Sequence, residues 1–331
     1  MRFGPVPIAE AEGAILAHRV DTDGGPLAKG SLLDAAAVAQ LAGAGLAEVI
    51  VARLDPGEIG EDAAAAQLAA ALAPDPEALG LRLTAAATGR VNLYAAGPGL
   101  FLPDAGRIAA LNRVHPMITL ATLPPFARVE PRSMVATAKI IAYGVPEVAL
   151  TEACRHAVGA LRVAPPVLHS ATLIETALAG EDPAPKGREA LGLRLRRLGV
   201  ALGPRCIVPH RAAPLAEALR QAEGEIVFIL TASATSDPGD VGPAALGLAD
   251  GRLIRFGMPV DPGNLLFLGD MQGRPVIGLP GCARSPALNG ADWVLERVIC
   301  GQRVTAEDIA AMGVGGLLKE IPTRGRPREA S

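Results

Sequence analysis

Two polar loops carry most of the residues in this chain of 331 that could do chemistry. The first loop, residues 231–240, follows the apolar run 225–230 and offers four hydroxyls, two carboxylates and many backbone amides. Its small side chains let an anion approach the backbone, and a helix expected to begin near Pro243 adds the positive end of its dipole. We therefore expect the loop to bind a phosphate. The residues expected to bind it are Ser233, Ala234, Thr235 and Ser236.

Asp237 and Asp240 are the carboxylates of this loop and its candidate catalytic residues. Hard oxygen ligands suit Mg²⁺, so Asp240 is also the candidate metal ligand, holding the ion against a phosphate. The alternative is that Asp240 caps the helix that follows, because Pro243 stands near the first helical position and caps are common. The two roles are compatible.

The second loop, residues 280–285, follows the apolar run 275–279. Pro280 and Gly281 predict a tight turn that opens backbone amides, including that of Cys282, towards a ligand. Arg284 and Ser285 could grip a phosphate, the arginine through its fixed fork of donors. In the alternative, Ser285 is a helix cap followed by Pro286, and Arg284 is solvated.

A third loop, residues 257–264, holds two prolines and two glycines in eight residues. This composition predicts a rigid turn, which we expect beside the other two loops. Its candidate binding residues are Pro262 and Gly263.

The elements around these loops alternate between strands and helices. This rhythm predicts an α/β fold with a mostly parallel, doubly wound sheet, in which ligands bind outside the carboxyl ends of the strands. The expected strands are 163–169, 201–208, 225–230, 265–268 and 275–279, and the expected helices are 186–198, 214–222, 243–248, 285–298 and 305–312.

The chain is long enough for more than one domain. Residues 163–321 form the expected α/β domain. A smaller mixed α+β region, residues 1–162, precedes it as one or two subdomains, with helices expected at 33–44, 61–72 and 104–113 and strands at 47–52, 81–87 and 134–141. The charged, proline-rich segment 322–331 is expected to be disordered.

Composition excludes several classes of function. A net charge of −3 gives no global basic field for a nucleic acid or an anionic membrane. The apolar runs are too short for a membrane span, and the first residues lack the apolar core of a secretory signal. Cys154, Cys206, Cys282 and Cys300 stand far apart, which indicates free thiols in a reducing compartment. We expect a cytoplasmic protein with no nucleic acid and no membrane partner.

The three loops, taken in order, resemble the molybdopterin-binding domain of the molybdenum cofactor biosynthesis family over residues 163–318. Members carry a strand, a glycine-rich loop and an Asp-Val-x-Pro helix start, matched here by Ala232-Ser-Ala-Thr235 and Asp240-Val-Gly-Pro243. Their Leu-Pro-Gly turn is matched by Leu279-Pro-Gly-Cys-Ala283, and the molybdenumtransferase Pro-Gly loop by Asp261-Pro-Gly-Asn264. Residues 9–17 and 29–33 resemble the region that precedes this domain in molybdenumtransferase-like proteins.

The resemblance implies that molybdopterin is the ligand, with Mg²⁺ and ATP as further cofactors, and that the protein forms a homo-oligomer. It leaves two functions open. The first is an enzyme, a molybdopterin adenylyltransferase or a molybdenumtransferase. The second is a carrier or chaperone that binds the cofactor without turnover and works with a separate molybdenum cofactor nucleotidyltransferase.

Departures from the family pattern favour binding over catalysis. Ala232-Ser-Ala-Thr235 replaces glycines, Gly239 stands where catalytic members have a basic residue, and Asp261 and Asn264 replace lysines. The loss of cations beside an anionic ligand weakens the stabilisation of transition-state charge. A further alternative, an unrelated nucleotide-binding α/β protein, rests on the fold alone.

Overall fold

The computed structural model describes residues 1–318, so the predicted tail 322–331 lies outside the described residues. The described chain divides into two compact units. Met1–Gly97 and Phe101–Val163 form the first unit, while Pro98–Leu100 and the chain from Ala164 onward form the second.

The first unit begins with a segment that has its own small core. Strand β5 (Glu48–Arg53) pairs antiparallel with β1 (Arg2–Pro7) on one side and with β2 (Ile15–Leu16) on the other. Helix α1 (Ala35–Gly43) packs on this sheet and is capped by Asp34, which accepts a hydrogen bond from the Ala37 amide. Buried side chains of both layers close this core: Ile8, Leu16, Leu33, Leu41, Val49 and Val51.

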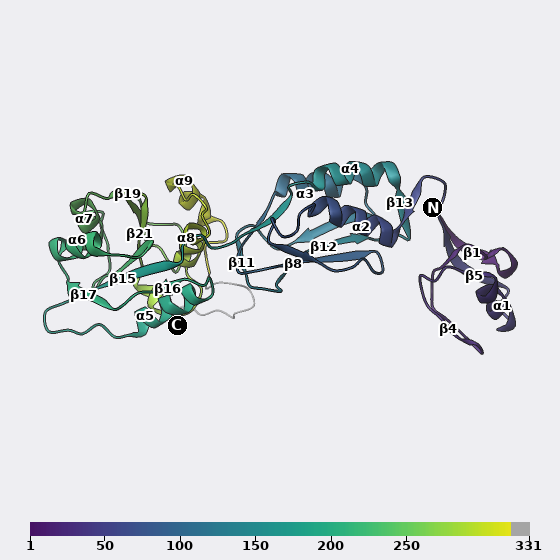
Figure 1. The fold of residues 1–331 in the computed structure, drawn as a ribbon, viewed down its shortest axis with the longest axis horizontal. Coiled ribbons are helices and arrows are strands. Elements are labelled where there is room, and N and C mark those ends of the chain that lie inside the picture. The colour runs from purple at the N-terminus through teal and green to yellow at the C-terminus, as the bar shows by residue number, and fades with distance from the viewer. Residues whose placement is uncertain (319–331) are drawn as a thin grey trace, which may run out of the picture. The chain divides into compact units, whose positions relative to one another are not determined.

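The rest of the first unit is built on a four-stranded antiparallel sheet in the order β10-β12-β8-β7. Helices α2, α3 and α4 cover one face of this sheet (Figure 1). The strands are β7 (Leu81–Leu83), β8 (Arg90–Ala95), β10 (Ile118–Thr122) and β12 (Met134–Ile140), and the helices are α2 (Glu61–Leu72), α3 (Ala105–Val114) and α4 (Glu147–Ala157). Every second residue of a strand faces the helices, so Val91, Leu93 and Ala95 are buried against them.

Short elements complete this part of the chain. They are the β3–β4 hairpin (Val20–Thr22 and Gly25–Leu27), the pair β6 (Glu58–Gly60) and β13 (Gly144–Pro146), and the sheet of β9 (Gly99–Pro103), β11 (Ala127–Val129) and β14 (Leu161–Ala164).

The second unit is built on a seven-stranded sheet whose centre is parallel. Strand β15 (Ser170–Ala177) pairs in parallel with β16 (Ala201–Leu202), β17 (Cys206–Pro209) and β18 (Ile226–Leu230), and β18 pairs in parallel with β21 (Arg274–Gly278). Beyond β21, strands β20 (Phe267–Met271) and β19 (Arg252–Phe256) run antiparallel. All five residues of β18 are buried, as is typical of a strand covered on both faces.

Helices connect the strands of this sheet. They are α5 (Lys186–Arg196), α6 (Ala212–Gln221), α7 (Val241–Leu248), α8 (Gly290–Ile299) and α9 (Ala306–Ala310). Leu215 and Leu219 of α6 and Leu246 of α7 pack with Ile229, Phe267 and other strand residues in one buried core. Within residues 1–318, no helix is long and apolar enough to cross a membrane.

The chain is therefore a mixed α/β protein, but several elements differ from those expected from sequence. Strands β15 and β19 were not predicted, and the expected strand 201–208 is two short strands, β16 and β17. The expected helix 285–298 begins only at Gly290, because the residues before it form a turn of 3₁₀ helix, Gly281–Arg284, and a loop.

Candidate functional site

The first and second loops lie side by side in the second unit. They follow β18 and β21, which are neighbouring parallel strands, so both leave the sheet at its carboxyl edge. A hydrogen bond joins them directly, because Nη2 of Arg284 donates to the Thr231 carbonyl oxygen at 2.9 Å. One nitrogen of the half-buried Arg284 guanidinium thus holds the two loops together.

The first loop presents a run of backbone amides. Its base is fixed by Thr231, whose Oγ1 donates to the Ser233 carbonyl oxygen at 2.7 Å and lies 3.2 Å from Oγ1 of Thr235. Ser233 and Ala234 are exposed and Thr235 is buried. Among the residues that the structure describes, the amides of Ser233, Ala234 and Thr235 have no hydrogen-bond partner. Three successive donors are therefore available to an acceptor such as a phosphate oxygen.

The two carboxylates of this loop are engaged with its own backbone. Oδ1 of Asp240 accepts from the Val241 amide at 2.7 Å, and its Oδ2 accepts from the Ser236 amide at 3.1 Å, so Asp240 is the cap of α7. Asp237 is exposed, and its Oδ1 accepts from the Gly239 amide at 2.7 Å. In the described part of the chain, no group of three or more His, Cys, Asp or Glu side chains could hold a metal ion. A Mg²⁺ ion at Asp240 would need further oxygen ligands from a bound phosphate.

The second loop offers a smaller set of donors. Pro280 is buried, whereas Gly281 and Cys282 are exposed. The Ala283 amide donates to the Pro280 oxygen and the Ser285 amide to the Cys282 oxygen, while Oγ of Ser285 accepts from the Ala287 amide at 3.3 Å. The amides of Gly281 and Cys282 have no partner within residues 1–318.

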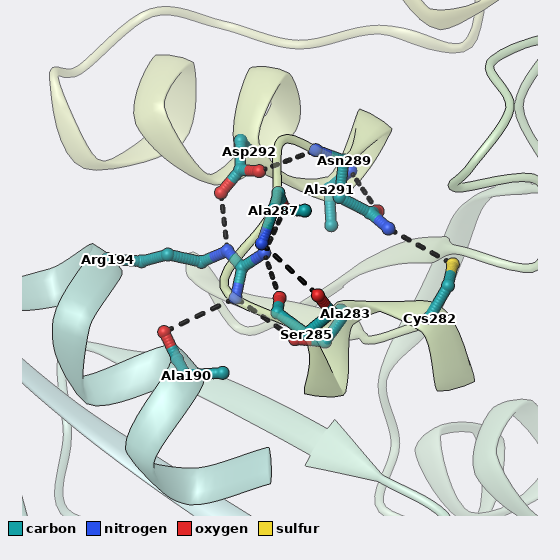
Figure 2. Close-up of polar contacts among 9 residues, drawn as sticks. All are labelled: Ala190, Arg194, Cys282, Ala283, Ser285, Ala287, Asn289, Ala291 and Asp292. Atoms are coloured by element: carbon teal, nitrogen blue, oxygen red, sulfur yellow. Dashed lines mark hydrogen bonds and ion pairs between the residues drawn. The ribbon is translucent and has the colours of Figure 1, made fainter. Parts of the chain in front are cut away.

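A buried arginine shapes the second loop (Figure 2). Arg194 of α5 donates from Nη1 to the carbonyl oxygen of Ala283 at 3.0 Å, and from Nη2 to those of Ser285 and Ala287 at 2.9 and 3.0 Å. Its remaining donors reach the Ala190 oxygen and the Asp292 carboxylate. All five N–H groups of the guanidinium are thus used. Because Arg194 draws three carbonyl groups towards the core, it fixes the course of the loop.

The third loop contacts the start of α8, and its Pro-Gly turn is buried and not open to a ligand. Pro262 and Gly263 are buried, and the Pro262 carbonyl oxygen accepts from the Gly290 amide at 2.8 Å. A Cβ atom on Gly263 would come within 2.9 Å of Gly290 Cα. The neighbouring Asn289 caps α8 and donates to Sγ of Cys282 at 3.0 Å. The start of α8 therefore connects the third loop to the second.

Two residues outside the three predicted loops, Thr176 and His210, extend this edge of the sheet. Thr176 is fully buried at the end of β15, and its Oγ1 accepts from the Ala232 amide at 2.8 Å. The same Oγ1 lies 2.8 Å from Nδ1 of His210, which follows β17. Thr176 thus ties three strand ends together at the base of the first loop.

A pocket of about 500 Å³ opens next to this contact, at the ends of β15 and β17. Most of its lining is apolar, including Leu178, Ile207 and Val208, while His210 and Arg211 supply polar groups. A neighbouring salt bridge orders the chain after β15, because Nε of Arg205 donates to the buried carboxylate of Glu175 at 2.9 Å. Hydrogen bonding to Glu175 raises the pKa of the Arg205 guanidinium.

The second unit is thus a parallel-centred α/β sheet with open amides and a pocket at its carboxyl edge. Residues 5–53, in the first unit, match a protein family described as a domain of unknown function, DUF8806. The matched residues belong to the N-terminal segment of β1, β2, α1 and β5, which has its own small core. No curated protein matches the chain.

Two solved structures have a distant likeness to the chain. One is a molybdopterin biosynthesis MoeA protein from Pyrococcus horikosii, at 13% identity and a TM-score of 0.31 over 90% of this chain and 75% of that one. The other is a molybdopterin biosynthesis MoeA protein from Pyrococcus horikoshii OT3, at 11% identity and a TM-score of 0.24 over 91% and 75%. Similarity at this level does not decide function.

Proposed function

We propose that the second unit binds molybdopterin and takes part in molybdenum cofactor biosynthesis. In this proposal the amides of Ser233, Ala234 and Thr235 hold the terminal phosphate of the pterin, and those of Gly281 and Cys282 lie beside them. The observation that carries the proposal is the run of three partnerless amides at the carboxyl end of β18. The resemblance of the loop motifs, taken in order, supplies the identity of the ligand.

The shape of this edge supports a small organic ligand with an anionic tail. A pocket of about 500 Å³ lies within the usual range for small-molecule sites, and its apolar lining suits a ring system. The parallel centre of the sheet supports a doubly wound arrangement, in which ligands bind at this edge. The pterin would occupy the pocket at β15 and β17 while its phosphate reaches the first loop.

A carrier role is favoured over catalysis. Both carboxylate oxygens of Asp240 accept hydrogen bonds from the backbone, and the residue acts as the N-terminal cap of α7. Arg284, on the second loop, is tied to Thr231. We propose that the protein presents the cofactor to a separate nucleotidyltransferase in the cytoplasm, as a homo-oligomer. The enzyme alternative, with Mg²⁺ and ATP, depends on Asp240 and Asp237.

Binding can be tested by titrating the protein into molybdopterin under anaerobic conditions and following pterin fluorescence. Ala234→Pro removes the middle amide donor, so the affinity should fall by about tenfold, as for a hydrogen bond to a charged group. Ala234→Ser keeps the amide and should bind like the parent protein. Thermal melts of both variants check folding. No binding by the parent protein, or equal binding by the two variants, would contradict the proposal.

Turnover is tested on the same preparation. Molybdopterin with MgATP is followed for pyrophosphate, and adenylated molybdopterin with molybdate is followed for AMP. Tight binding without either product supports the carrier. Product formation that Asp240→Ala abolishes, while pterin affinity is retained, would establish the enzyme alternative instead.

A further inference from the structure

Within the first unit, helices α2, α3 and α4 cover one face of the four-stranded sheet, and no helix of this unit covers the other face (Figure 1). On β8, Val91, Leu93 and Ala95 face the helices, so Arg90, Asn92 and Tyr94 point to the other side. Strand register places further residues on the same side, because directly opposite residues share a face. We define the open face by six residues, each exposed or half-buried: Arg82, Arg90, Asn92, Tyr94, Thr137 and Lys139.

The open face carries three cations and no carboxylate. Arg90 and Lys139 stand directly opposite each other on β8 and β12, an arrangement of like charges that destabilises a bare sheet. Within the described residues, neither Arg82 nor Arg90 has an ion-pair partner. An anion between Arg90 and Lys139 would relieve their repulsion.

Lys139 has weak contacts at the edge of this face. Its Nζ donates to the Thr88 carbonyl oxygen at 3.4 Å. Glu61, at the start of α2, interacts with Lys139: burial and the neighbouring Asp62 raise the pKa of the Glu61 carboxyl, and Lys139 and Lys29 lower it.

The middle of the open face offers an aromatic ring and polar groups. Tyr94 lies on β8, an interior strand, directly opposite Arg82 of β7. Next to it, Oγ1 of Thr137 donates to Oδ1 of Asn92 at 2.9 Å. An aromatic ring with a cation on the neighbouring strand and further cations along the same face suits a base that stacks while phosphates meet the cations. An acidic polypeptide would use the charges but would leave the ring without a role.

We infer that the open face of this sheet binds single-stranded nucleic acid. Phosphates lie between Arg90 and Lys139 and beside Arg82, and one base stacks on Tyr94. The net charge of −3 for the whole chain predicts no such partner, because a sum over the chain hides the separation of charge between surfaces. The function is independent of pterin binding, since every residue that carries it lies in the first unit.

The inference is tested by fluorescence anisotropy with labelled 12-nucleotide oligouridine and oligothymidine at low salt. Arg90→Ser with Lys139→Ser should weaken binding at least tenfold and reduce the slope of log affinity against log salt by about 0.7 for each phosphate contact that is lost. The control is Arg196→Ser with Arg197→Ser, which changes net charge equally at two exposed positions of the second unit. It should bind like the parent protein.

Variants of Tyr94 separate stacking from charge. Tyr94→Leu should weaken binding at least fivefold, and Tyr94→Phe, which keeps the ring, should retain it. Thermal melts confirm that each variant is folded. The inference is wrong if the parent protein does not bind either oligonucleotide, or if both double variants bind equally. It is also wrong if polyglutamate competes as well as the oligonucleotides and Tyr94→Leu has no effect, which would indicate an acidic polypeptide as the ligand.

Discussion

Arg194 and Asp292 form a buried ion pair across 98 positions of the sequence, with Nε of the arginine donating to Oδ1 of the aspartate. The other carboxylate oxygen of Asp292 accepts from the Asn289 amide at 2.8 Å and completes the capping box of α8. The pair therefore couples α5, the second loop and the start of α8 (Figure 2). A single side chain of α5 controls how the loop beside the proposed phosphate site is presented.

Removal of this guanidinium should be costly. Arg194→Met leaves the Asp292 carboxylate and three loop carbonyl groups without their partner, so we expect the free energy of unfolding to fall by about 3–5 kcal/mol. Urea unfolding followed by circular dichroism measures the change. Arg196→Met, on the exposed side of the same helix, is the control and should stay within about 0.5 kcal/mol of the parent protein. Similar midpoints for the two variants would show that the buried pair does not hold the loop.

Thr176 should matter for both stability and ligand binding. Thr176→Val removes the hydroxyl that accepts from Ala232 and contacts His210, at nearly constant volume, so we expect a loss of about 1–3 kcal/mol from the unpaired buried groups. Molybdopterin affinity should fall as well, because the base of the first loop is released. Thr176→Ser keeps the hydroxyl. Its losses of stability and of molybdopterin affinity should each be less than half of those caused by Thr176→Val. If the valine and serine variants behave alike in the melt and in the pterin titration, the hydroxyl has no such role.

The cysteines should differ sharply in reactivity. Burial, with a smaller contribution from Glu296, raises the pKa of the Cys300 thiol from its ordinary 9.0 to about 12, whereas Cys282 is exposed on the second loop. At pH 8, iodoacetamide should modify Cys282 first and leave Cys300 unmodified in the folded protein, which peptide mass spectrometry over time can follow. Early modification of Cys300 would contradict its burial.

The raised pKa of the Cys300 thiol also makes the free energy of unfolding depend on pH. A thiol whose pKa is higher in the folded state favours folding fully below the unfolded value of 9.0, and this contribution is lost as pH rises through about 12. Unfolding midpoints of the parent protein should therefore fall over that range. The unfolding midpoint of Cys300→Ala should fall less steeply with pH than that of the parent protein. Parallel curves for the two proteins would mean that another group titrates.

The sequence predicts those elements whose patterns are local. Helix α2 spans Glu61–Leu72 as expected, because acids at its start and an unbroken run of good helix formers need no distant partner. The apolar run of β18 and the two turns that follow β18 and β21 were also visible, since buried parallel strands are continuous in hydrophobicity.

Elements that depend on distant partners escaped prediction. Strand β15 pairs with three other strands of the larger sheet, yet Glu175 and Thr176 interrupt its apolar pattern. Their burial is compensated by Arg205, His210 and the Ala232 amide, all at least 30 residues further on. A strand that contains a buried polar pair therefore cannot be predicted from its own residues, because the partners that compensate the burial lie elsewhere in the sequence.

Arg194 was hidden for a related reason. Its neighbours Leu191 and Leu195 mark the buried side of α5, and the pattern gives no sign that an arginine joins them. The carbonyl groups of Ala283, Ser285 and Ala287 that it holds lie 89 to 93 residues away. Strand β8 was missed as well, so the alternation of Arg90, Asn92 and Tyr94 had no predicted sheet to belong to.

The antiparallel hairpin at one side of the larger sheet has a consequence for self-association. Strand β19 is the outermost strand there, and an uncovered outer strand can recruit a strand from another molecule. Arg252 and Arg255 charge this strand, and its pairing with β20 is irregular between Leu253 and Arg255. Charge and a bulge both discourage further strand addition, so the hairpin protects the protein from aggregation along this edge.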